Sequence, residues 1–234
     1  MVAVMKREIG AYFQSPVGYV FLAVYYLFAG FYFFTGCLFY RSGDLVPVFN
    51  SLFTVQLFLI PMLTMRLMSE ERKNKTDQVL LTVPLSLTAM VLGKYFAAAL
   101  MLVLAEGMVL IYALGVSFFS PLYLPVFVGC FAAILLLGLS LISVGLFISS
   151  LTENQVISAI GGYGASLFFL LIDSLRAVFT NPVAERLISS VSFFNRYQSF
   201  SIGIFNYANI LYFLSVSTVF IFLTIRVFEK RRWG

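Results

Sequence analysis

Long apolar runs alternate with short polar segments along this chain of 234 residues. A helix needs roughly 20 mostly apolar residues to cross about 30 Å of hydrocarbon. Six runs meet or approach that length, and they cover residues 17–40, 45–65, 85–118, 125–151, 156–172 and 207–227. The pattern predicts an all-α integral membrane protein, with six transmembrane helices in a single domain over residues 1–234.

Two of the predicted spans carry residues that shape helix packing. Pro61 lies inside the second span and should kink it, either as a hinge or as plain geometry. The fourth span contains small residues that allow neighbouring helices to approach closely, namely Gly138, Ser140, Ser143 and Gly145.

The third span carries a carboxylate far from either end. Glu106 follows Lys94, near the predicted inner end of this span, by twelve residues, or about 18 Å along a helix. This spacing places Glu106 near the middle of the bilayer, where an ionisable residue is a functional candidate by default. The alternative, which we favour, is a neutral or hydrogen-bonded glutamate that stabilises helix packing.

The first 15 residues form an amphipathic pattern instead of a span. One face of a helix would carry apolar residues and the other polar ones, respectively Val2, Met5, Ile9, Tyr12 and Phe13, and Arg7, Gly10 and Gln14. We expect an interfacial helix along the cytoplasmic leaflet. Pro16 then allows a sharp turn into the first span.

Residues 173–206 neither span a membrane nor look disordered. Charges are scattered among apolar residues here, at Asp173, Arg176, Glu185, Arg186 and Arg196. Within this segment, Pro182 to Val191 has the spacing of a short amphipathic helix. We expect an ordered segment on the outer side.

The densest charge lies in the loop over residues 66–86. Its charged residues are Arg66, Glu70, Glu71, Arg72, Lys73, Lys75 and Asp77, and Val79, Leu80 and Leu81 follow them. A short amphipathic helix fits this stretch, with Thr76 as its cap and Pro84 favouring a break soon after it. By spacing alone, the loop either carries a force from a soluble partner or is a solvated loop whose charges fix the topology.

Composition excludes a soluble domain, because 61% of the residues are hydrophobic and 11% are charged, against roughly 25% charged in soluble domains. The net charge of +5 suits anionic lipid and the positive-inside rule, so we expect membrane lipid and not nucleic acid as a partner. Eleven cations lie on the assigned inner side, namely Lys6, Arg7, Arg66, Arg72, Lys73, Lys75, Lys94, Arg226, Lys230, Arg231 and Arg232. Only Arg41, Arg176, Arg186 and Arg196 lie outside. The expected protein is a multi-pass protein of the cell membrane with both termini in the cytoplasm.

Catalytic chemistry is not visible in the sequence. The chain has no His, which argues against a zinc site and against His-based catalysis. No G-x-x-x-x-G-K-[ST] phosphate loop occurs. Cys37 and Cys130 lie in apolar runs, where two unpaired thiols are expected unless both lie near the outer face and form a disulfide. We therefore expect no enzyme, no metal and no cofactor on this chain.

Two motifs resemble one known family. The run from Thr76 to Lys94 resembles the hallmark loop of ABC type-2 exporter permeases through Thr76, Leu80, Leu81, Thr82, Pro84, Ser86, Leu92, Gly93 and Lys94. It departs from that pattern at Asn74 or Lys75, where the family has glycine, and at Gln78, where the family has glutamate. The closing segment from Ser199 to Trp233 is similar to the gliding-motility-type subgroup.

The resemblance implies a transmembrane permease subunit of an ATP-driven transporter, an exporter that forms its substrate path as a homodimer or with a closely related second permease. Residues 1–15 would be its elbow helix, and residues 66–86 would hold a cytoplasmic coupling helix that docks a separate ABC ATPase subunit. The coupling residues would be Glu70, Glu71, Arg72, Thr76, Val79, Leu80, Leu81 and Pro84. ATP and Mg would bind on that partner.

The resemblance also implies re-entrant outer helices over residues 173–206, with Arg196 and Phe200 at an outer gate. Two alternatives remain open. The first is a structural or assembly scaffold in the membrane without transport activity. The second is an intramembrane enzyme, which the missing catalytic constellation disfavours.

Overall fold

The computed structural model describes residues 1–74, 86–121, 123–176, 192–203 and 206–233, with the backbone alone for residues 173–176 and 231–233. Every regular element among them is a helix. In chain order these are α1 (Val2–Gln14), α2 (Pro16–Phe33), η1 (Phe34–Leu38), α3 (Val46–Thr64), α4 (Arg66–Lys73), α6 (Leu87–Ser117), α7 (Leu124–Leu151), α8 (Gln155–Arg176), α10 (Phe193–Ser201) and α11 (Tyr207–Trp233).

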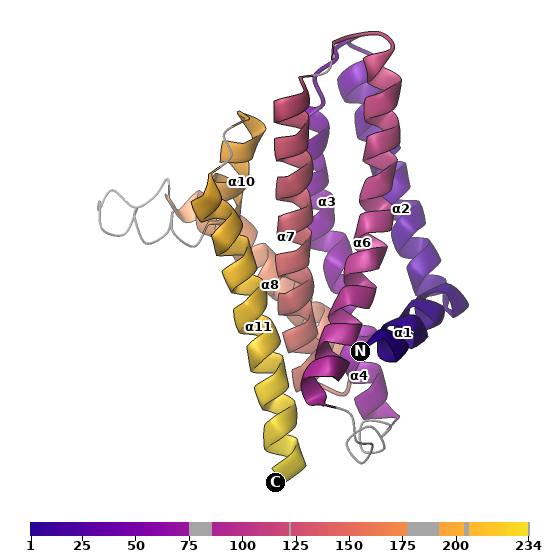
Figure 1. Cartoon of the computed structure of the whole chain (residues 1–234), viewed down its shortest axis with the longest axis vertical. Coiled ribbons are helices and arrows are strands. Elements are labelled where there is room, and N and C mark those ends of the chain that lie inside the picture. The colour runs from indigo at the N-terminus through magenta and orange to yellow at the C-terminus, as the bar shows by residue number, and fades with distance from the viewer. Residues whose placement is uncertain (75–85, 122, 177–191, 204–205, 234) are drawn as a thin grey trace.

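Six helical stretches among the described residues are long and apolar enough to cross a membrane, which confirms the predicted class. They are Pro16–Leu38, Val46–Lys73, Leu87–Ser117, Leu124–Leu151, Gln155–Ile172 and Tyr207–Lys230. Both termini lie toward one end of the bundle, and the turns after η1 and α6 lie at the opposite end (Figure 1).

Helix α7 is the centre of the bundle. It packs against α3, α4, α6, α8, α10 and α11, and Figure 1 shows it between α11 on one side and α6 on the other. Large apolar side chains stay exposed along α2, α6, α8 and α11, for example Leu27, Ile111, Ile160 and Leu211. In a membrane protein these side chains are suited to lipid contact.

The small residues of α7 allow close helix contacts, as the sequence predicts. A Cβ added at Gly138 would overlap the side chain of Leu102 on α6, and one at Gly145 would overlap Thr64 on α3. Ser140 is buried and donates a hydrogen bond to the carbonyl oxygen of Phe213 on α11, over 2.9 Å. Small side chains thus bring α7 close to three neighbours.

Replacing Gly145 with alanine is expected to destabilise the bundle. The added methyl group would meet both Thr64 Oγ1 and Thr64 Cβ, and overpacking of this kind typically costs about 1–3 kcal/mol. Gly107→Ala is the matched control, because nothing lies within 4 Å of its added Cβ. The check is thermal stability in detergent, and equal melting temperatures for the two variants would contradict the close α3–α7 contact.

Three details differ from the sequence-based expectation. The first span ends in a π-helical turn, η1, and not in regular α-helix. The second span continues through α4 to Lys73, so part of the segment expected as a loop is helical. The fifth helix continues to Arg176, past its expected end at Ile172. The predicted helices at Thr76–Pro84 and Pro182–Val191 lie outside the described residues.

Candidate functional site

A charge cluster centred on a buried lysine joins three helices at the end of the bundle where the chain begins. It consists of Arg7 and Glu8 from α1, Glu71 from α4 and Lys94 from α6. Figure 1 shows these helices meeting there, with α1 lying across the bundle axis. Two positive and two negative side chains make the cluster neutral as a whole.

Lys94 is the centre of this charge cluster, with its side chain only 1% exposed. Its ammonium donates to the carbonyl oxygen of Leu67 over 2.6 Å and lies 3.1 Å from Glu8 Oε1 and 3.0 Å from Glu71 Oε2. An ammonium has three N–H donors, so each donor has an acceptor. Arg7 pairs with both carboxylates from the more exposed side.

Glu8 depends on these cations for its charge. Burial alone would raise the pKa of the Glu8 carboxyl, but Lys94 and Arg7 together lower it below its ordinary value of 4.5. Its ionised form therefore contributes stability above pH 4.5, which is lost as the pH falls through the lower pKa of the folded state. Acid should thus loosen the contact of α1 with α6.

Ser149 of α7 holds the start of α4. Its hydroxyl oxygen accepts hydrogen bonds from the backbone N–H groups of Met68 and Ser69, both over 3.1 Å, and it donates to the carbonyl oxygen of Met65 over 3.0 Å. The first N–H groups of a helix have no partner within that helix. A side chain of a neighbouring helix supplies one here, which fixes α4 on the end of α7.

Two arginine side chains also fix the position of α4. Arg72 Nη2 lies 2.8 Å from Glu153 Oε1, and Arg72 Nη1 donates to the carbonyl oxygen of Ser150 over 3.3 Å. On the other side, Arg66 pairs with Glu70 over 3.1 Å and lies 5.6 Å from the ring centre of Tyr12 on α1. Helix α4 is therefore tied to both α1 and α7.

The predicted coupling residues fall into two groups. Glu70, Glu71 and Arg72 lie on α4, and each has a charged partner within the chain. Glu71 and Arg72 pair with residues outside α4, whereas Glu70 pairs with Arg66 of the same helix. The predicted role of these residues in coupling to a partner protein stays a prediction. Thr76, Val79, Leu80, Leu81 and Pro84 lie outside the described residues, as part of the segment that directly follows this anchored helix.

Glu106 lies in a second polar group, inside the bundle. Its side chain is fully buried, and its Oε1 accepts hydrogen bonds from the Tyr25 hydroxyl of α2 and from Gln56 Nε2 of α3, the latter over 2.6 Å. Gly138 of α7 lies against the same group, because a Cβ there would be 3.2 Å from Gln56 Oε1. Four helices thus surround one carboxyl group.

The predicted outer gate residues both lie on α10. Arg196 donates to Asn209 Oδ1 of α11 over 3.1 Å and lies 4.1 Å from the ring centre of Tyr212. Phe200 is fully buried. Both side chains therefore attach α10 to the bundle in this conformation, and their role as a gate stays a prediction.

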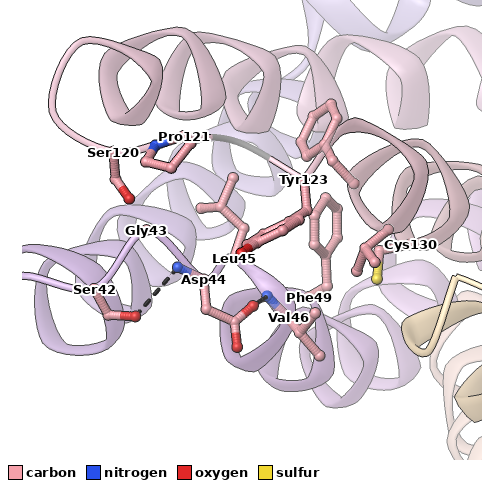
Figure 2. A pocket seen from close by; sticks show the side chains of 12 residues that line it. Ser42, Gly43, Asp44, Leu45, Val46, Phe49, Ser120, Pro121, Tyr123 and Cys130 are labelled. Carbon is pink, nitrogen blue, oxygen red and sulfur yellow. Dashed lines mark hydrogen bonds between the residues drawn. The ribbon is translucent and has the colours of Figure 1, made fainter.

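The end of the bundle opposite the charge cluster is hollowed. A cavity of about 480 Å³ lies between the turn before α3 and the start of α7, lined by Ser42, Gly43, Asp44, Leu45, Val46, Phe49, Ser120, Pro121, Tyr123, Val126, Phe127 and Cys130. Figure 2 shows Asp44 oriented toward Val46, whose backbone N–H it accepts over 2.9 Å. Aromatic rings and small polar groups share the lining.

Cys37 and Cys130 are free thiols and both are buried.

Sequence reasoning missed most partners of these polar groups. Lys94 and Glu106 stood out because charges are rare within the apolar runs. Glu8 is the first acidic residue of the chain and Gln56 is a polar residue within the second span, so both could have been singled out from the sequence. Ser149 could not, because its role depends on where α4 begins.

The charge cluster and the Ser149 hydrogen bonds connect α4 to α1, α6 and α7. Among the described residues, no group of three or more His, Cys, Asp or Glu side chains could hold a metal ion. Comparison with models of known protein families finds no match, and comparison with curated proteins finds no significant match either.

Proposed function

We propose that this chain is the membrane-spanning permease subunit of an ATP-driven ABC exporter, coupled to a separate ATPase subunit. The loop after α4 docks the ATPase, and the bundle forms the substrate path with a second permease. Both termini and this loop lie on the cytoplasmic side, which gives α1 the position of an elbow helix in the interface.

The anchoring of α4 is the observation that carries this proposal. Residues 74–86 connect α4 to α6, so a force applied to this segment would be transmitted to both helices. Helix α4 is tied to α1 and α6 by the charge cluster and to α7 by Ser149 and Arg72. A displacement of the loop would therefore move several helices together, which is what a coupling element requires. The family resemblance of residues 76–94 supports the same assignment.

In this proposal the charges of α4 hold the helix that precedes the docking segment. Glu71 pairs with Lys94 of α6, and Arg72 pairs with Glu153 after α7. Docking would rest on the apolar side chains Val79, Leu80 and Leu81, which suit a groove on a partner.

Leu80→Asp is expected to abolish co-purification of the ATPase from native membranes, since it would bury a charge in the docking contact. The permease itself should still insert, because the substitution lies outside every predicted span. Lys73→Met is the control, with an exposed side chain at the end of α4, and should retain the ATPase. Undiminished ATPase with Leu80→Asp would rule out docking through this residue, and a wild-type chain that brings down other membrane components but no ATPase would favour the scaffold alternative.

A further inference from the structure

The pair formed by Glu106 and Gln56 contains two polar atoms without a hydrogen-bond partner in the described part of the chain. Gln56 Nε2 donates to Glu106 Oε1 over 2.6 Å. Among the residues that the structure describes, Glu106 Oε2 and Gln56 Oε1 have no hydrogen-bond partner, although both side chains are fully buried. Both atoms are acceptors if the carboxyl group is ionised, and buried acceptors without a donor are rare in folded proteins.

We propose that this pair is a binding site for one proton, carried by Glu106 Oε2 and donated to Gln56 Oε1. A carboxylic acid and a primary amide can join through two hydrogen bonds, one from the amide N–H to the acid carbonyl and one from the acid O–H to the amide carbonyl. The first of these bonds is present. One proton would supply the second and satisfy both remaining atoms.

The opposite orientation of the Gln56 amide leads to the same site. It would place Gln56 Oε1, an acceptor, 2.6 Å from Glu106 Oε1, and two acceptors at that distance need a proton between them. The Tyr25 hydroxyl donates to Glu106 Oε1 in either case. The proton requirement therefore does not depend on how the amide is turned.

The surroundings of Glu106 favour the neutral acid. Glu106 forms no salt bridge among the described residues, and its described hydrogen-bond partners are the uncharged Tyr25 and Gln56. Among the other described titratable side chains, Tyr197 of α10 interacts electrostatically with Glu106, and Cys130 of α7 interacts in turn with Tyr197. A buried carboxylate without a counter-ion is costly within a bilayer.

Infrared spectroscopy of the full chain in lipid bilayers at neutral pH tests this site, because the C=O stretch of a carboxylic acid is separate from the bands of carboxylates. We expect wild type to show a carboxylic acid band that is absent in Glu106→Gln. In Gln56→Leu the band should remain and move to higher frequency, because the carbonyl loses one hydrogen-bond donor. This second variant assigns the band without replacing Glu106. Absence of any carboxylic acid band from wild type would overturn the proposal.

Exchanging Glu106 and Gln56 provides a second test of the proton site. The double variant Gln56→Glu with Glu106→Gln puts the acid on α3 and the amide on α6, so the same pair can form. It should show the carboxylic acid band and a melting temperature near that of wild type. A folded swap variant without the band would contradict the proposal.

Discussion

Lys94→Met is expected to prevent stable assembly of the bundle. The substitution keeps much of the apolar stem but removes the ammonium that pairs with Glu8 and Glu71, both of which are mostly buried. Loss of one partner of a buried ion pair typically costs about 3–5 kcal/mol, which is a large part of the stability of a typical folded protein. The measurements are the yield of folded protein in membranes and its melting temperature in detergent.

Two further variants separate charge from packing in this prediction. Lys73→Met removes an exposed cation from the end of α4 and should change little. In Lys94→Met, Arg7 is the one remaining described cation for the two carboxylates. Adding Glu8→Gln and Glu71→Gln removes this excess negative charge and should recover part of the lost stability. If Lys94→Met were as stable as Lys73→Met, the charge cluster would not hold α1, α4 and α6 together.

Glu106→Lys is expected to block folding in the membrane almost completely. The cation would face the amide of Gln56 and the hydroxyl of Tyr25 in a fully buried site. Insertion scales assign about 2.5–3.5 kcal/mol to a charged residue at the centre of a membrane helix. A buried position inside a packed bundle adds steric overlap to that cost.

Glu106→Gln is the matched control for this substitution. A glutamine side chain has the shape of the protonated acid, and its amide N–H can donate where the acid O–H would. Folding and transport should therefore be nearly those of wild type. A Gln variant that folds normally but no longer transports would show that the carboxyl group itself takes part in transport, and a stable Glu106→Lys variant would place residue 106 in contact with water.

The apolar pattern predicted the spans well because the bilayer imposes a length and a composition on each helix. The small residues of α7 predicted close helix packing, because only small side chains let two helices approach closely. The pattern did not predict that the second span continues through α4. By spacing alone, the segment that holds Glu71 and Arg72 could be a solvated loop or a coupling loop. Spacing could not decide, because the charged partners of these two residues, namely Arg7, Lys94 and Glu153, come from distant parts of the sequence.

The polar group around Glu106 shows the same limit. Sequence spacing placed the carboxylate at mid-depth and suggested a hydrogen-bonded residue. It could not name Tyr25 or Gln56, because which faces of α2 and α3 turn toward α6 depends on packing. Spacing within one helix is local information, whereas the partners of a buried polar group are set by the whole bundle.

A photo-reactive residue placed at Asn74 tests the coupling proposal most directly. Asn74 is exposed where α4 ends, at the start of the proposed docking loop. The same residue at Tyr123, which is 76% exposed at the opposite end of the bundle, is the control. Illumination of intact cells should cross-link an ABC ATPase to position 74 and not to position 123. Failure to capture an ATPase at position 74 while one is captured at position 123, or no ATPase at either position, would contradict a cytoplasmic coupling site after α4.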